Sequence, residues 1–214
     1  MINERSGLKN CDGKMCVVIC RYHGYSLGNL YRKYDKRMSY CRRMKMNNIT
    51  LIGMPGSGKS TVGVVLAKIM GYKFLDSDLL IQEREQRKLC DIIEEEGQET
   101  FLKIEDEVNA GINVSQTVIA TGGSACYCEN AMSHLREIST VVYIKLSYEE
   151  VEKRLGDLTK RGVVLKEGYT LKDLYEERCP LYEKYAHIIV DEGHLDLKGV
   201  IEKTQIAIQN YKES

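Results

Sequence analysis

From residue 48 onward, the apolar residues of this chain follow two patterns, short continuous runs and helical spacing. Short apolar runs predict five strands, over residues 48–52, 73–75, 117–120, 140–145 and 187–190. Between them, helical spacing of apolar residues predicts helices over residues 59–70, 77–86, 91–96, 99–113, 171–185 and 197–211. Ser147, with Glu150 three residues later, predicts the capping box of one more helix.

Short apolar strands separated by helices indicate a parallel sheet with helices on both faces. We therefore predict an α/β fold, a three-layer sandwich around a five-stranded parallel sheet. Ligands of such sheets bind beyond the carboxyl ends of the strands, and every motif described below follows or lies near such an end. Residues 157–169 are polar and contain two glycines, which is typical of a mobile loop.

Residues 1–45 show neither pattern and have a different composition. They hold 11 Lys and Arg against 3 Asp and Glu, a balance of +8, whereas residues 46–214 carry −8. We interpret the segment as a basic extension, disordered or translated from a misassigned start codon, before a domain over residues 46–214. A nucleic-acid or membrane-surface arm is the alternative suggested by its charge and tyrosines, but we expect neither partner.

The composition indicates an ordinary globular protein, with 43% hydrophobic and 29% charged residues. There is no apolar run of about 18 residues, as a membrane span requires, and no signal peptide. We expect a cytoplasmic monomer whose eight cysteines are reduced.

A phosphate-binding pattern follows the first predicted strand. The segment Gly53-Met54-Pro55-Gly56-Ser57-Gly58-Lys59-Ser60 matches G-x-x-x-x-G-K-[ST] in full. Glycines let backbone N–H groups surround phosphate oxygens, Lys59 supplies a charge at the β- and γ-phosphates, and the Ser60 hydroxyl coordinates Mg²⁺. The pattern predicts ATP and Mg²⁺ as cofactors, with nucleotide contacts from Gly53, Gly56, Ser57, Gly58, Lys59, Ser60 and Thr61.

Two carboxylates close the second predicted strand, Asp76 and Asp78. One can help to hold Mg²⁺ while the other accepts the proton of an attacking hydroxyl. Considered alone, such an aspartate is better explained as the N-cap of the next helix, but a phosphate loop upstream favours the catalytic interpretation.

The ordered set of motifs resembles the shikimate kinase family over residues 48–190. The residues that carry the resemblance are residues 53–61, Asp76-Ser77-Asp78, Glu94-Glu95-Glu96-Gly97 with Phe101 and Glu105, Ala120-Thr121-Gly122-Gly123, Arg161, and Arg178-Cys179-Pro180-Leu181-Tyr182. The resemblance implies a P-loop NTPase fold similar to that of nucleoside-monophosphate kinases, with a mobile lid. It also implies a small-molecule substrate.

The resemblance further implies a role for individual residues around the acceptor. Asp78 would hydrogen-bond the acceptor hydroxyl and Asp76 would lie beside Mg²⁺. Gly122 and Gly123 would bring backbone N–H groups to the acceptor, and Arg178 would pair with its carboxylate.

Two further arginines are implied on the nucleotide side. Arg161 would move in with the lid to contact phosphate, and together with Lys59 and Asp78 it makes up the implied catalytic set. Arg154 falls where the family places an arginine against the adenine ring. The alternative for both arginines is a solvated surface charge.

The chain departs from the family pattern at three positions. The family usually has an arginine directly after the phenylalanine matched by Phe101, and the resemblance implies that it is a second clamp on the acceptor carboxylate. This chain has Leu102 there, and the neighbouring Lys103 is rotated about 100° away on a helix. Ser124 replaces a third glycine, and Gly162 replaces the proline after the lid arginine.

Three functions follow from this reading. The first is transfer of phosphate from ATP to the 3-hydroxyl of shikimate, a step of aromatic amino-acid biosynthesis. The second is the same chemistry on another small hydroxylated metabolite, such as a sugar acid, which Leu102 supports. The third is a non-catalytic nucleotide-binding module, against which the retention of Asp78, Arg161 and Arg178 argues.

Overall fold

A computed structural model of the protein describes residues 47–155 and 168–213. In these ranges five strands form one sheet in the order β2-β3-β1-β4-β5, and every neighbouring pair is parallel. The strands are β1 (Asn48–Ile52), β2 (Lys73–Asp76), β3 (Thr117–Ala120), β4 (Ser139–Lys145) and β5 (Ile188–Asp191). The predicted five-stranded parallel sheet is confirmed.

Eight α-helices lie in the described part of the chain. They are α2 (Lys59–Met70), α3 (Ser77–Glu85), α4 (Leu89–Glu96), α5 (Gln98–Ala110), α6 (Glu129–Ile138), α7 (Tyr148–Leu155), α8 (Leu171–Tyr185) and α9 (Leu197–Glu213), with a short 3₁₀ helix, η1 (Ala125–Tyr127), before α6. None of the described helices is both long enough and apolar enough to cross a membrane.

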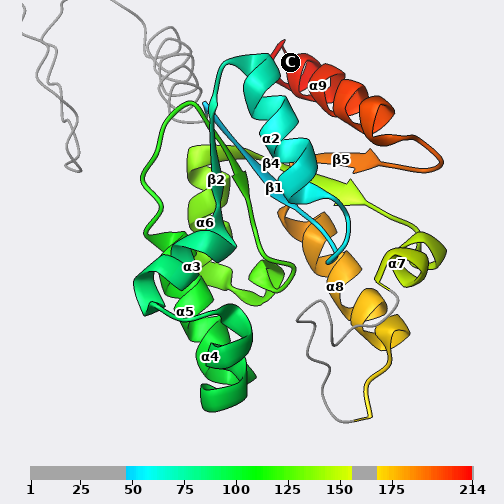
Figure 1. The fold of residues 1–214 in the computed structure, drawn as a ribbon. Helices are drawn as coiled ribbons and strands as arrows, with labels where there is room; N and C mark the ends of the chain where they lie inside the picture. Colours follow the sequence, from blue (N-terminus) through cyan, green and yellow to red (C-terminus); the bar gives the residue numbers. More distant parts are fainter. Residues whose placement is uncertain (1–46, 156–167, 214) are drawn as a thin grey trace, which may run out of the picture. The chain divides into compact units, whose positions relative to one another are not determined.

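The sheet is the middle of three layers. Helices α2 and α9 pack together on one face, and α6 and α8 cover β4 from the other (Figure 1). Side chains of β4 alternate accordingly: Val142 and Ile144 join the core under α2 and α9, while Val141 and Tyr143 join the core under α6 and α8. The two buried faces confirm the predicted sandwich.

Helix α6 was not predicted from the sequence. Its residues Ala131, Met132 and Leu135 are fully buried, so an apolar face with helical spacing was present. The helix was missed because the segment begins with polar residues and has no strong N-cap residue. Cys128, at the N-cap position, makes no side-chain capping bond. The predicted box before α7 is half formed: Ser147 Oγ accepts the Glu150 N–H at 3.3 Å, but the Glu150 carboxylate pairs with Arg154.

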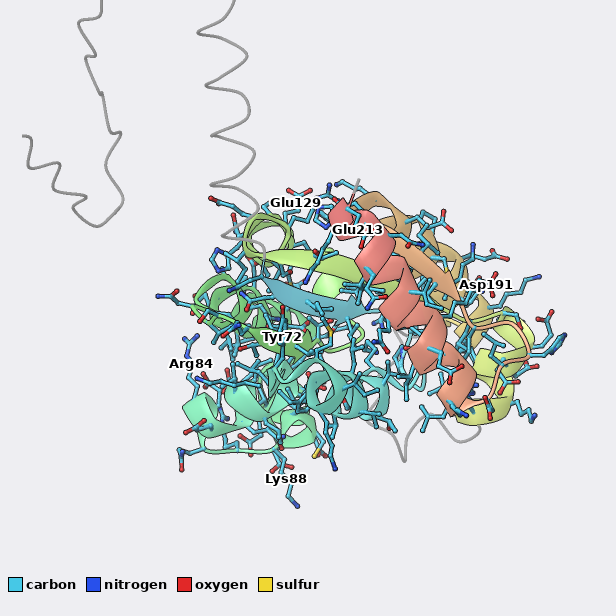
Figure 2. All side chains as sticks on the ribbon, turned by 90° about the horizontal axis from the view of Figure 1, so that it is seen from above. Tyr72, Arg84, Lys88, Glu129, Asp191 and Glu213 are labelled. Carbon is cyan, nitrogen blue, oxygen red and sulfur yellow. The ribbon has the colours of Figure 1, made fainter. Side chains whose placement is uncertain are left out.

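The carboxyl ends of the three strands β2, β3 and β1 lie at one level. Ala120 is in register with both Asp76 and Leu51, and the Thr121 N–H donates to the Leu51 carbonyl at 3.2 Å. The segments that follow these strands therefore meet at one edge of the sheet. In the view from above, Lys88, between α3 and α4, lies at the lower edge of the molecule, and Asp191, at the end of β5, lies at its right side (Figure 2).

Candidate active site

The phosphate loop links β1 to α2, and its conformation requires glycine. Gly56 and Gly58 have φ of 79° and 76°, in the left-handed region that other residues rarely adopt. The Lys59 ammonium donates to the carbonyls of Gly53 at 2.9 Å and Met54 at 3.0 Å, so the side chain lies against the loop. Burial lowers the pKa of Lys59 to about 8, against the opposing charge of Asp78.

Two predicted metal-site residues are brought together at the start of α2. The Ser60 hydroxyl donates to Asp76 Oδ2 at 2.8 Å, and Asp76 Oδ1 accepts the N–H of Asp78 at 3.0 Å. Asp76 thus caps α3 while it faces the phosphate loop, so its capping role is compatible with the predicted metal-site role. Thr61, another predicted nucleotide contact, is exposed and lines the cavity that is described below.

Asp78 lies in the first turn of α3, facing the end of β3. Burial and the charge of Asp76 raise the pKa of its carboxyl, and the ammonium of Lys59 lowers it. A β-carbon on Gly122 would lie 2.8 Å from Asp78 Oδ1, which is closer than such atoms pack. At Gly123 a β-carbon would meet Pro55 Cγ at 2.7 Å and Arg178 Nη1 at 3.2 Å. Both predicted glycines therefore allow functional groups to approach the backbone.

Glu105, on α5, belongs to this site although the sequence suggested no role for it. Its side chain is fully buried, and its Oε1 has no hydrogen-bond partner among the described residues. Burial raises the pKa of Glu105 to about 7, with a smaller rise from Asp78 and an opposing hydrogen bond from Ser124. Its place between Phe101 and Asn109 on the buried face of α5 was the available signal, because a carboxylate there is unusual.

Arg178, on α8, reaches the same site from the opposite wall. It is 4% exposed, its Nε donates to the Tyr127 hydroxyl at 3.3 Å, and its guanidinium carbon lies 5.2 Å from the centre of the Tyr127 ring. Among the described residues no Asp or Glu forms an ion pair with it. Tyr127 was not singled out in the sequence, where nothing marks it as a partner of a residue 51 positions away.

A cavity of about 740 Å³ joins these groups. It is lined by Pro55, Gly56, Gly58, Lys59, Ser60, Thr61, Asp78, Gln82, Lys88, Leu89, Cys90, Ile93, Gln98, Phe101, Leu102, Thr121, Gly122, Gly123, Ser124, Leu155 and Arg178. Leu102 faces the cavity, whereas Lys103 is exposed and outside its lining. The prediction that Lys103 points away from the pocket is confirmed.

Arg154 lies at the end of α7, beside the phosphate loop. Its Nε donates to Glu150 at 2.8 Å, and its Nη1 lies 2.9 Å from Glu192, which is buried. The next residue, Leu155, lines the cavity and would lie 3.2 Å from a β-carbon on Gly56. Arg161 and Gly162, with the other residues from 157 to 167 of the mobile loop predicted over residues 157–169, fall outside the described residues.

The chain is similar to one group of proteins along most of its length. The family model described as shikimate kinase matches residues 55–209. The shikimate kinase of Nitrosomonas europaea is 39% identical over 171 residues, which cover 78% of this chain and 79% of that protein. That of Moorella thermoacetica is 36% identical over 169 residues, which cover 78% and 97%.

A solved structure agrees with this similarity. The shikimate kinase from Acinetobacter baumannii in complex with shikimate superposes with a TM-score of 0.69 at 30% identity. The match covers 78% of this chain and 96% of that chain.

Proposed function

This chain belongs to the shikimate kinase family, and on that premise we propose that it transfers the γ-phosphate of ATP to the 3-hydroxyl of shikimate. The observation that carries the proposal is Arg178, a buried guanidinium without a carboxylate partner among the described residues, in the wall of the cavity that also holds the phosphate loop. Because a buried unpaired charge is costly, the cavity favours an acceptor that brings an anion. Shikimate offers a carboxylate and hydroxyls on one small ring.

The loop between β1 and α2 is assigned to the phosphates of ATP. Backbone N–H groups at the start of α2 and the positive end of that helix would face the phosphate oxygens. Lys59 would exchange its two carbonyl contacts for oxygens of the β- and γ-phosphates. The other assigned contacts are Gly53, Gly56, Ser57, Gly58, Ser60 and Thr61.

Ser60 and Asp76 are assigned to Mg²⁺. Both offer the hard oxygen donors that this ion prefers, and their oxygens lie 2.8 Å apart at the end of the phosphate loop. When bound, Mg²⁺ supplies positive charge against the phosphates of the nucleotide. The residues present therefore fit the ion.

Asp78 is assigned to the acceptor hydroxyl. It lines the cavity near Lys59, which brings the attacking oxygen and the γ-phosphate to the same place. The hydroxyl oxygen forms the new bond to phosphorus, the bond to the β–γ bridging oxygen breaks and ADP leaves. The proton of the hydroxyl passes to Asp78. Alignment and charge neutralisation supply most of the rate, and no covalent enzyme intermediate is needed.

The remaining acceptor contacts lie around the end of β3. Gly122 and Gly123 line the cavity and let an acceptor approach the backbone, and Arg178 would bind the carboxylate with two N–H donors. On the nucleotide side we assign Arg154 to the adenine ring, because it adjoins Gly56 through Leu155. Arg161 is assigned to phosphate by the resemblance alone. A cytoplasmic monomer stays a prediction.

The test is a turnover assay with ATP and a panel of acceptors that includes shikimate, sugar acids and uncharged polyols. We expect phosphorylation of shikimate, and Lys59→Ala should lower its rate at least a hundredfold while the circular dichroism spectrum is unchanged. Leu102 makes the panel informative, since an apolar wall would suit a different acceptor. Turnover of another compound but not of shikimate would refute the proposed acceptor.

A further inference from the structure

We propose that Tyr127 is a positioning residue for Arg178: it holds the guanidinium so that its two terminal nitrogens face the acceptor carboxylate. The inference rests on the proposed function. It explains how one arginine can serve where the family pattern has two, the second being replaced by Leu102.

The contacts of Arg178 divide its guanidinium into two sides. Nε donates to the Tyr127 hydroxyl at 3.3 Å, and the Tyr127 ring lies against the guanidinium at 5.2 Å. Nη1 lies instead beside Gly123, which lines the cavity. A β-carbon added to Gly123 would lie 3.2 Å from this nitrogen. Tyr127 thus occupies the Nε side of the guanidinium and leaves the terminal nitrogens for a ligand.

A tyrosine orients the guanidinium without neutralising it. A carboxylate in the place of Tyr127 would fix Arg178 equally well, but it would cancel the charge that has to attract the acceptor. The phenol hydroxyl accepts one hydrogen bond, and the ring attracts the cation by its electrons. Because Arg178 is 4% exposed, little water competes with these contacts.

The wall that carries Tyr127 is itself held to α8. Tyr182, one turn after Arg178, donates its hydroxyl to the Gly123 carbonyl. Tyr182 is fully buried, and η1 packs against α8. The orientation of Arg178 therefore depends on a rigid surface and not on a loose loop.

Among the described residues that line the cavity, no other cation is placed to bind the acceptor carboxylate in the place of Arg178. Lys59 is engaged with the phosphate loop, and Lys88 lies at the edge of the molecule, as Figure 2 shows. A bidentate contact to a carboxylate needs a defined guanidinium plane. When a single arginine supplies that contact, whatever fixes its plane contributes directly to acceptor affinity.

The experiment compares Tyr127→Phe with the wild-type enzyme, using shikimate and the methyl ester of shikimate as acceptors. We expect Tyr127→Phe to raise the KM for shikimate by about three- to tenfold, as the loss of one hydrogen bond implies. The kcat and the KM for ATP should stay within about twofold. The KM for the ester, which has no carboxylate to be held, should not change. Tyr127→Leu, which also removes the ring, should raise the shikimate KM further.

Tyr72→Phe is the matched control. The Tyr72 hydroxyl lies 3.5 Å from Lys212 Nζ, with the ring 5.6 Å from that ammonium, and Tyr72 does not line the cavity. The Tyr72→Phe variant loses the same kind of contact away from the cavity, so it should keep the wild-type KM for shikimate. Leu102→Arg added to Tyr127→Phe should recover the lost affinity by supplying a second guanidinium.

The other possible results overturn either the positioning role of Tyr127 or the proposed function. If the wild type phosphorylates shikimate and Tyr127→Phe leaves the KM unchanged, or raises it equally for shikimate and the ester, the positioning role is overturned and the proposed function stands. If the wild type does not phosphorylate shikimate, the proposed function fails, and the inference that rests on it fails too. Thermal unfolding of each variant verifies that the fold is intact.

Discussion

The Oε1 atom of Glu105 lies 2.6 Å from the point that a β-carbon on Gly122 would occupy. Asp78 Oδ1 lies 2.8 Å from the same point, so two carboxyl groups from two helices pack against the bare backbone at the end of β3. Only a residue without a side chain leaves room for both. The glycine therefore holds together the part of the site assigned to the acceptor.

Gly122→Ala should damage acceptor use far more than folding. The added methyl group would push the Asp78 carboxyl away from its position, and we expect the KM for shikimate to rise at least tenfold with a lower kcat. Gly111→Ala is the control, because its β-carbon would meet nothing closer than 3.4 Å. Steady-state kinetics and thermal unfolding of both variants measure the difference. Near-normal kinetics of Gly122→Ala would contradict the assigned acceptor site.

Glu105 should make the stability of the protein depend on pH. Burial raises the pKa of this carboxyl from 4.5 to about 7, so the folded state binds the proton more tightly than the unfolded state. The contribution of Glu105 is therefore fully favourable below pH 4.5 and is lost as the pH rises through 7. At about 1.4 kcal/mol for each unit of pKa difference, the loss is at most about 3 kcal/mol.

Glu105→Gln isolates this effect, because glutamine is neutral at every pH. We expect the free energy of unfolding of the variant, relative to the wild type, to increase between about pH 5 and pH 8 and to level off above. Urea unfolding at a series of pH values measures it. A difference that is constant across this range would show that Glu105 is ionised in the folded protein throughout.

Leu102→Arg should lower the KM for shikimate by about tenfold. Residue 102 lines the cavity one turn before Glu105 on α5, so a guanidinium there would meet the carboxylate of the acceptor and could also pair with the free Oε1 of Glu105. The kcat should not rise, since the carboxylate is remote from the reacting oxygen and is held equally in the ground and transition states.

Lys103→Arg serves as the control for the added guanidinium, because residue 103 is exposed and outside the cavity lining. Kinetics with shikimate compare the two variants. A higher KM for Leu102→Arg would mean that a charge had been buried without a partner, and that the natural acceptor places no carboxylate beside α5.

A chain that begins at Met46 should fold and act like the full chain. All strands and helices listed above begin at or after Asn48, and the shift from +8 to −8 in charge falls just before them. The midpoint of thermal unfolding and the turnover number of the two proteins are the measurements. A loss of several degrees or of most of the activity would show that residues 1–45 contribute to the kinase domain.

Elements that are marked by turn or capping residues at their own ends could be predicted from the sequence. Elements that depend on packing against distant segments were harder to predict. The helix that begins at Lys59 follows from the glycine loop before it and the αL glycine, Gly71, after it. By contrast α6 lacks a capping side chain, and its burial depends on α5 and β4. Its amphipathic face alone did not distinguish it from a loop.

The amino-acid sequence by itself determined the phosphate loop, the acidic end of β2 and the five parallel strands. The phosphate loop and the acidic strand end depend on neighbours within a few residues, because near sequence sets backbone conformation and capping. The parallel sheet follows from the alternation of apolar strands and helices along the chain. Only the tertiary structure decided that Arg178 rests on Tyr127 and that Glu105 faces Asp78 across Gly122. These residues belong to different helices and turns, and periodicity records that a face is buried without recording which distant side chain meets it there.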